Sequence, residues 1–247
     1  MLQMMTTMNL SQNERGKSCF TTVQHMGKIA FLDKMCSNVQ DMLEYLQSIW
    51  NAGDVKELIS FLSSEMRKKY FDSGEKLVDV KLKMDSLLIQ QKRLLWSDSE
   101  GDKVYGVVAL VILDRKMRRW LLSIYGIAQR NEDKLLLEEY HLLDVRKLSP
   151  KEELDKIELA VIKQKKNNDN LQDCLEKLGY SRKDNEKIVI YAKDEENVKI
   201  AYDGKYIICC SDDRNLLRRC VKLTVKCLRL EESRVCLKDG VIKIDER

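Results

Sequence analysis

Residues 45–62 read YLQSIWNAGDVKELISFL, and this stretch decides how the first half of the chain is interpreted. Around its start, apolar residues recur every three or four positions, as on one buried helix face: Val39, Met42, Leu43, Leu46, Ile49 and Trp50. Gly53 is a good left-handed cap for that helix, and Asp54 can cap a second helix with Glu57 three residues later. The stretch therefore predicts a helix pair joined by a sharp turn. The second helix would bury Val55, Leu58, Ile59 and Leu62.

From about residue 85 the pattern changes to short apolar runs separated by charged turns. The runs are rich in Val, Ile, Leu, Tyr and Trp, which predicts an antiparallel meander of about four strands over residues 85–145. Residues 104–113 (VYGVVALVIL) are almost continuously apolar, so we expect a central strand that is buried on both faces. Residues 76–83 fit a helix or a strand equally well.

The first half resembles the nuclear transport factor 2-like superfamily over residues 37–145. The resemblance rests on Trp50-Asn51-Ala52-Gly53-Asp54 at the end of a helix, and on two closing strands in residues 120–144 (WLLSIYGIAQRNEDKLLLEEYHLLD). It implies a cone-like fold, in which a curved sheet wraps helices around a pocket. In some members that pocket is a small-molecule or catalytic site. The charged segment at residues 76–83 departs from the family pattern, and the third helix of the family is not evident.

A domain boundary is predicted near residue 148. Ser149 can cap a helix there, Pro150 can take its first position, and Glu152 completes a capping box. We expect helices over residues 151–166 and 171–180, followed by three short strands within residues 187–210. Asp203-Gly204 is a strong hairpin turn between the last two strands, and a final hairpin is expected around Asp239-Gly240. The second half thus predicts helices packed on an antiparallel sheet of about five strands.

Residues 211–230 predict a helix capped by Ser211 or Asp212. Its apolar seam would be Leu216, Cys220, Leu223, Cys227 and Leu230, although alternating residues also allow a strand over residues 221–227. On the helix interpretation, six cations form a stripe opposite the seam: Arg214, Arg218, Arg219, Lys222, Lys226 and Arg229. Such a stripe can bind nucleic-acid phosphates, an acidic protein surface or a membrane surface, or be a solvated face balanced by nearby acids. It carries no aromatic residue on which a base could stack.

Two sets of residues are candidates for the pocket that the resemblance implies. Glu139 and His141 are two positions apart on a predicted strand, so they share a face and could transfer a proton together, unless that face is exposed. Tyr105, Trp120 and Tyr125 could line the pocket, or could be ordinary core and cross-strand residues.

The composition argues against several classes of site. The chain has eight cysteines, two histidines and no C-x-x-C pattern, so we expect no zinc site, and no glycine-rich phosphate loop or other catalytic motif indicates a cofactor. Without a visible secretory signal, the thiols are expected to be free, mostly buried and in a reducing compartment, the cytoplasm or the nucleus. No run of 18 apolar residues indicates a membrane span. A net charge of +4 requires any nucleic-acid site to be a local patch.

The sequence therefore predicts an α+β protein in three segments. Residues 1–36 are a flexible N-terminal tail, with a transit peptide as the alternative. Residues 37–148 are a helix pair with a curved antiparallel sheet, and residues 149–247 are a smaller α+β domain with a basic amphipathic helix. The leading hypothesis is a non-enzymatic adaptor that acts through protein–protein contacts. RNA binding through the basic helix and a small-molecule enzyme in the cone pocket are the alternatives, and a homodimer through the sheet is left open.

Overall fold

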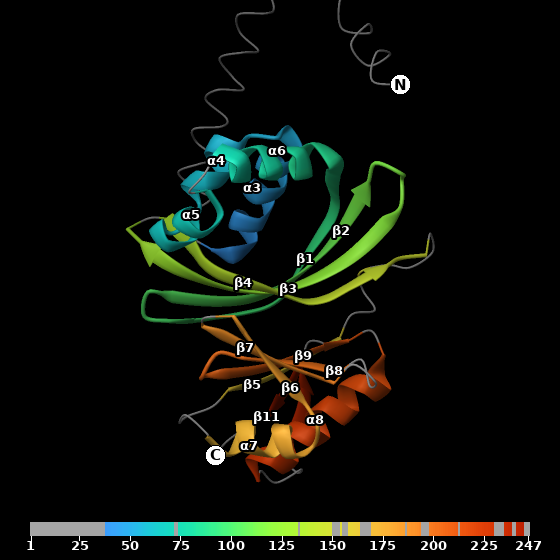
Figure 1. Ribbon diagram of the computed structural model, residues 1–247. Helices are drawn as coiled ribbons and strands as arrows, with labels where there is room; N and C mark the ends of the chain where they lie inside the picture. Colours follow the sequence, from blue (N-terminus) through green and yellow to red (C-terminus); the bar gives the residue numbers. More distant parts are fainter. Residues whose placement is uncertain are drawn as a thin grey trace, which may run out of the picture.

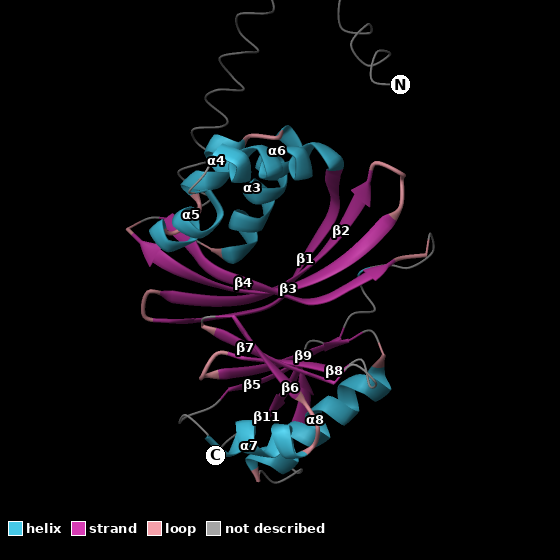
Figure 2. Ribbon diagram, in the orientation of Figure 1, coloured by secondary structure: helices cyan, strands magenta, loops and turns pink. Residues whose placement is uncertain are grey.

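The computed structural model describes residues 38–71, 74–132, 134–149, 154, 158–163, 169–185, 187–193, 198–211, 213–229, 235–238 and 241–244. These residues form four layers: a group of helices, a four-stranded sheet, a seven-stranded sheet and two further helices (Figures 1 and 2). The α+β class is confirmed. The prediction of a tail or transit peptide in residues 1–36 lies outside the described residues.

The first layer holds α3 (Val39–Ala52), α4 (Val55–Ser60), α5 (Ser64–Phe71) and α6 (Gly74–Ser86). The predicted turn between the first two is confirmed: Gly53 is left-handed, with φ 66°, and its N–H donates to the carbonyls of Ile49 and Trp50. The Asp54 side chain accepts a hydrogen bond from the Glu57 N–H, as expected for a cap. The Glu57 carboxylate, however, accepts a hydrogen bond from the Tyr45 hydroxyl at 2.6 Å.

Residues 76–83, which fit either a helix or a strand, lie within α6. Two helices, α5 and α6, therefore follow the predicted pair. They were hard to recognise because little of either helix is apolar and buried: Met66 is the buried residue of α5, and Met84 is buried in α6. Val78 and Leu82 on α6 are exposed instead, so no apolar stripe marks the helix in the sequence.

The predicted meander is confirmed as β1 (Leu87–Glu100), β2 (Lys103–Asp114), β3 (Arg119–Asn131) and β4 (Lys134–Lys147), in that order and antiparallel throughout. β2 lies between β1 and β3, as its apolar run predicts. One face of this sheet packs on the helices through Val104, Ala128 and Leu135. Side chains of α3 also hold β1 directly. The Trp50 indole donates to the Leu87 carbonyl at 2.9 Å, and the Asn51 amide both donates to and accepts from the Ile89 backbone.

The second sheet contains β5 (Glu158–Lys163), β6 (Ser181–Asn185), β7 (Ile188–Lys193), β8 (Val198–Tyr202), β9 (Tyr206–Ser211), β10 (Val235–Lys238) and β11 (Val241–Ile244). Its order is β10-β11-β5-β9-β8-β7-β6, and it is antiparallel except where β11 pairs with β5. α7 (Asp169–Lys177) and α8 (Arg214–Leu228) cover its outer face. The helix interpretation of residues 211–230 and the turn at Asp203-Gly204 are confirmed, with φ 89° at Gly204.

The helix predicted over residues 151–166 is wrong in its second half, because Glu158–Lys163 is strand β5. Ala160 and Ile162 face the helices of this half, whereas Leu159 and Val161 face the other sheet, and all four are buried. A strand buried on both faces has a continuous apolar run instead of an alternating one, so periodicity alone does not distinguish it from a buried helix. The five-strand estimate also missed β6, a polar strand at the sheet edge.

The two sheets pack face to face around one apolar core. From the first sheet it contains Val107, Tyr125 and Ile127, and from the second Ile190 and Ile208, among others. Polar contacts cross the same interface. The Tyr125 hydroxyl donates to the Asp203 carboxylate at 2.6 Å, and the Tyr206 hydroxyl donates to that of Asp98 at 2.6 Å. Lys163 also pairs with Asp98, at 3.0 Å. The halves of the chain are therefore joined by shared burial as well as by the backbone.

Because Tyr125 is buried and its hydroxyl has an ionisable partner across the interface, Tyr125→Phe should leave Asp203 short of one hydrogen bond. We expect it to lower the free energy of unfolding by about 1–2 kcal/mol. Urea unfolding followed by tryptophan fluorescence and by far-UV circular dichroism measures this. Both signals should shift together in one transition, whereas Tyr70→Phe, on the helix side of the first sheet, should shift them less. A second transition that keeps its wild-type midpoint would contradict the shared core.

Candidate functional site

The strongest candidate site is the outer face of α8. The helix begins after Asp213, whose side chain accepts a hydrogen bond from the Asn215 N–H at 2.8 Å. The predicted caps were one or two residues early: the Ser211 hydroxyl accepts a hydrogen bond from the Asp213 N–H at 3.0 Å, and Asp212 lies outside the described residues. The helix ends at Arg229, which is left-handed with φ 56°. Both ends of α8 are therefore fixed by local hydrogen bonds.

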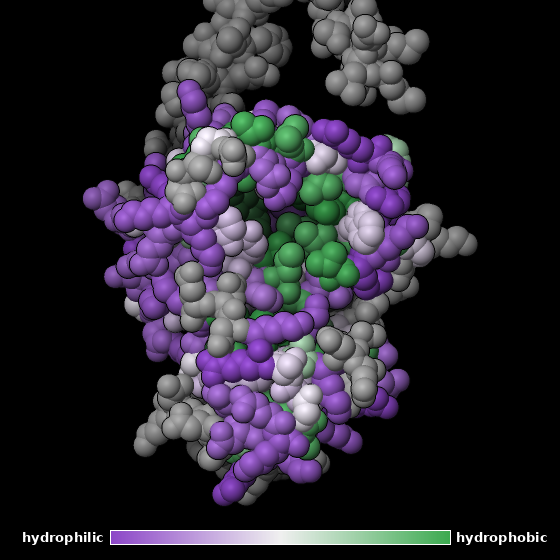
Figure 3. Space-filling model, in the orientation of Figure 1, coloured by the Kyte–Doolittle hydropathy of each residue, from purple (hydrophilic) through white to green (hydrophobic). Residues whose placement is uncertain are grey.

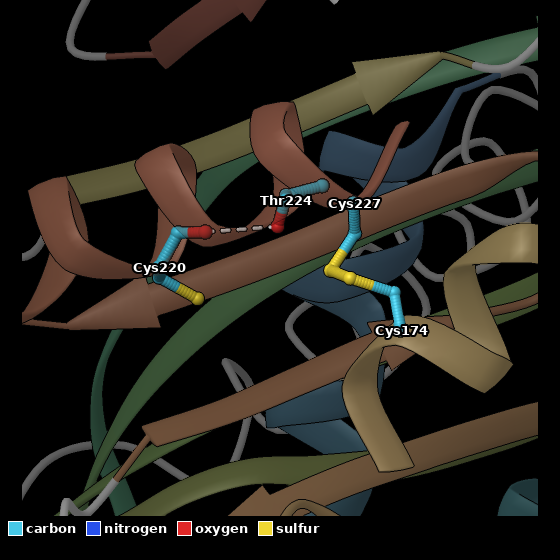
Figure 4. Close-up of a disulfide and its surroundings, with 4 residues drawn as sticks. All are labelled: Cys174, Cys220, Thr224 and Cys227. Carbon is cyan, nitrogen blue, oxygen red and sulfur yellow. Dashed lines mark hydrogen bonds between the residues drawn. A yellow bond between two sulfur atoms is a disulfide. The ribbon is translucent and has the colours of Figure 1, made fainter. Parts of the chain in front are cut away.

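The inner face of α8 packs on the second sheet and fixes the rotation of the helix. Its buried residues are Leu217, Cys220, Val221, Thr224, Val225, Cys227 and Leu228. Cys220 and Cys227 of the predicted seam are among them, Leu216 and Leu223 are half-buried, and Leu230 lies outside the described residues. The one hydroxyl in this set is satisfied, since Thr224 donates to the Cys220 carbonyl at 2.8 Å (Figure 4).

A disulfide joins α8 to α7. Cys174 and Cys227 are bonded, with their Cα atoms 5.5 Å apart and a separation of 53 positions in sequence (Figure 4). The expectation of free thiols is therefore wrong for these two cysteines, whereas Cys209 and Cys220 are free and buried. Cysteine spacing does not reveal a pairing that only the packing of two helices creates. The bond anchors the last turn of α8 to its neighbour.

With the inner face fixed in this way, the six predicted cations are all exposed on α8 and its end: Arg214, Arg218, Arg219, Lys222, Lys226 and Arg229. The last five form no ion pair with any residue that the structure describes. From Arg214 to Arg229 the stripe spans roughly 22 Å, at the usual rise of an α-helix. These residues present an extended positive face, called the α8 cationic face below.

Glu139 and His141 do share a face of β4, but that face points toward the second sheet. In the β3–β4 register they are opposite Ile127 and Tyr125, which belong to the core between the sheets. Glu139 is only 2% exposed, and its carboxylate accepts a hydrogen bond from the Lys187 N–H at 3.0 Å. Burial, and then the charge of Lys199, lowers the pKa of His141, which favours the neutral imidazole. The pair is therefore part of the contact between the sheets and not of a pocket under the helices.

The aromatic pocket candidates are separated. Tyr105 and Tyr125 lie in the core between the sheets, where the Tyr105 ring is 4.8 Å from that of Tyr206. Trp120 lies on the opposite face of the first sheet, since the register alternates with Leu121. It is half-buried, and its indole donates to Asp114 at 3.1 Å. The three residues line no common site.

The helix side of the first sheet is only partly covered. Figure 3 shows a hollow on this side of the molecule with a hydrophobic floor. Leu142 and Val145 of β4 are exposed, and the register places them opposite Ile124 and Leu122, on the face that carries the helices. Of the site candidates predicted from the sequence for the first half, only Trp120 is on the helix-bearing face of the first sheet. The sequence pattern predicts which residues share a face of a strand, but it does not predict whether helices or a second sheet cover that face.

No helix in the described part of the chain combines the length and the apolar character that crossing a membrane requires.

Removing the disulfide tests how firmly α8 is anchored. The double variant Cys174→Ser/Cys227→Ser should lower the free energy of unfolding by up to about 4 kcal/mol, the chain-entropy value for a loop of 53 residues. Urea unfolding with and without a thiol reductant gives the comparison. Reductant should bring the wild type down to the stability of the double variant and leave the variant unchanged. Equal stability of wild type and variant without reductant would contradict the anchor.

Comparisons with known proteins give little further information. No protein-family model matches the chain, and no curated protein matches it. Among solved structures, the chain is similar to a SEC-C motif containing protein from Rhodopseudomonas palustris, with 12% sequence identity and a TM-score of 0.39. The similarity covers 46% of this chain and 87% of that one. A likeness at this level carries no argument about fold or function.

Proposed function

We propose that this chain is a non-enzymatic binding protein that docks an acidic surface of a protein partner on the α8 cationic face. The observation that carries the proposal is the exposure of all six cations on one side of a helix whose other side is buried. Five of them have no ion pair within the described residues, so binding would not require an existing pair to be broken. An adaptor role is proposed from this surface, together with the lack of a catalytic motif in the sequence.

Rigidity supports the same proposal. α8 is held by its buried face and by the disulfide to α7, so its backbone needs no ordering when a partner binds. A fixed row of charges steers an oppositely charged partner during encounter and sets its register. Such binding weakens as salt screens the charges.

Nucleic-acid binding through the same face is the second proposal. A row of cations roughly 22 Å long can follow a phosphate backbone. The outward positions of α8 carry no Phe, Tyr or Trp, however, and single-stranded RNA is usually held by stacking on such residues. The acidic protein surface is therefore preferred.

A third proposal concerns the first half of the chain. We propose that it is a nuclear transport factor 2-like unit, with a cone-like arrangement of α3–α6 and the curved sheet, and that residues 149–247 form a second unit. The hydrophobic hollow in Figure 3 supports an apolar ligand site there. Glu139 and His141 lie on the other face of the sheet, so we propose binding and not catalysis for the hollow. Cytoplasm or nucleus remains the proposed compartment, although the disulfide between Cys174 and Cys227 fits a reducing compartment poorly.

Neutralising three cations tests the leading proposal. Arg218→Gln/Lys222→Gln/Lys226→Gln should weaken binding of a labelled glutamate-rich peptide by on the order of tenfold or more, because each lost charge removes part of the attraction. Fluorescence anisotropy at several salt concentrations measures the affinity, and the salt dependence should also flatten. The control is Lys56→Gln/Lys68→Gln/Lys134→Gln, which removes the same charge from exposed positions on the first half.

Repeating the titrations with single-stranded RNA and with duplex DNA separates the two partner classes. Tighter binding of a nucleic acid than of the peptide, lost in the α8 triple variant, would favour the second proposal. Equal effects of the α8 and control triples would mean that only the net charge matters, and the α8 face would then not be a site.

A further inference from the structure

A second positive surface lies at the turn between β2 and β3, residues 114–119 (DRKMRR), called the β2–β3 tip below. It contains four cations, Arg115, Lys116, Arg118 and Arg119, and one carboxylate, Asp114. Between the cations stands Met117, which is 74% exposed, the highest value among the large apolar side chains described. An apolar apex flanked by cations is unusual for a turn, where small polar residues predominate.

The β2–β3 tip is held rigidly. One carboxylate oxygen of Asp114 accepts hydrogen bonds from the N–H groups of Lys116 and Arg118, each at 2.9 Å. The other accepts from the Arg118 side chain at 2.7 Å and from the Trp120 indole at 3.1 Å. Desolvation opposes ionisation of Asp114, but these hydrogen bonds outweigh it and hold its pKa well below the usual value. The tip therefore keeps one shape with Met117 at its end.

The backbone at Met117 is strained. Its φ is 60°, in the left-handed region that glycine and asparagine adopt most easily. A residue with a longer side chain costs about 1 kcal/mol there, and an exposed apolar side chain adds no stability by burial. Stability alone would thus favour glycine at this position. A strained, exposed residue at a rigid apex is a reason to look for a function.

Two cations of the tip lack ion-pair partners among the described residues, whereas charged side chains at the opposite end of the same sheet have them. The end of β1 there is acidic, and two of its carboxylates are paired across the sheet interface, Asp98 with Lys163 and Glu100 with Lys205. At the tip, Arg115 and Lys116 are exposed and form no ion pair with a described residue. Leu88, which is paired with Leu113 just below the turn, adds a second exposed apolar side chain.

We propose that the β2–β3 tip is a docking site for the surface of an anionic phospholipid membrane. Met117 enters the region between the headgroups, and Arg115 and Lys116 contact their phosphates and carboxylates. Peripheral membrane sites combine an apolar insertion with cations that meet the negative leaflet. Trp120 is half-buried behind the tip, with the Arg118 guanidinium 5.5 Å from its ring centre. In this position it would lie at the level of the lipid headgroups, where tryptophan is enriched in membrane proteins.

A nucleic acid fits the tip less well. An exposed methionine at the apex offers nothing to a phosphate backbone, and the Trp120 ring is not free for a base because Arg118 lies over it. The proposal is also independent of the α8 cationic face, because α8 lies beyond the second sheet and the tip belongs to the first (Figure 1).

Sedimentation of the full chain with lipid vesicles tests the proposal. The probes are vesicles of phosphatidylcholine alone and of phosphatidylcholine with 30% phosphatidylserine, a roughly physiological share of anionic lipid. Wild type should bind the anionic vesicles, and more weakly as salt rises. Arg115→Gln/Lys116→Gln should reduce binding by on the order of tenfold or more. Met117→Gly should reduce it by about fivefold while keeping or raising the thermal midpoint, since glycine relieves the strain.

Two controls make the outcomes distinct. Val78→Ala removes an exposed apolar side chain from α6, and Lys56→Gln/Lys68→Gln removes two charges from exposed positions on α4 and α5; both should bind vesicles as the wild type does. Absence of vesicle binding by the wild type, or normal binding by both tip variants, would overturn the proposal. So would tip variants that lose binding to short duplex DNA but not to vesicles. The glutamate-rich peptide should bind all tip variants normally, so failure here leaves the α8 proposal separately testable.

Discussion

The contact between the two sheets is the constraint on which the rest of the structure depends. Each sheet gives one face to the other, so each has only one face left for its own helices. Two hydrogen bonds add to this contact, from the buried Tyr125 to the half-buried Asp203 and from the buried Tyr206 to the half-buried Asp98. A hydrogen bond to an ionised carboxylate is stronger than one between neutral groups. With both inner faces occupied, a working surface within the described residues has to lie on the outer helices, in the uncovered part of the first sheet or at the strand ends.

This arrangement explains which parts of the fold could be predicted from the sequence. The turn at Gly53-Asp54, the meander, the turn at Asp203-Gly204 and the helix that carries Arg214 to Arg229 all depend on neighbours in the chain, and these were predicted. The sequence of β5 predicts a helix, because its pairing partners β9 and β11 follow it by many residues and both of its faces are buried, by the helices on one side and by the first sheet on the other. α5 and α6 bury too little apolar surface to leave a periodic signal.

The candidate sites also differ in whether they depend on neighbouring or on distant parts of the chain. The cations of α8 could be placed on one face from spacing alone, because a helix fixes the relation between spacing and direction. The prediction that Glu139 and His141 share one face of a strand is confirmed. That this face packs on a second sheet could not be predicted, because no local sequence pattern indicates the second sheet. Trp50 and Asn51 show the same limit of prediction from sequence. The sequence places Trp50 on the buried face of a helix and Asn51 at its end, yet both also hold the first strand nearly 40 residues away.

The disulfide between α7 and α8 has a consequence for how the chain responds to cleavage. Cys174 and Cys227 enclose β6, β7, β8, β9 and most of α8 in one covalent loop. A protease that cuts once anywhere within that loop opens the ring without dividing the molecule, and the two pieces stay joined until the sulfur bond is reduced. The residues of the α8 cationic face from Arg214 to Lys226 lie inside the ring, so such a nick leaves them attached to the remainder of the protein.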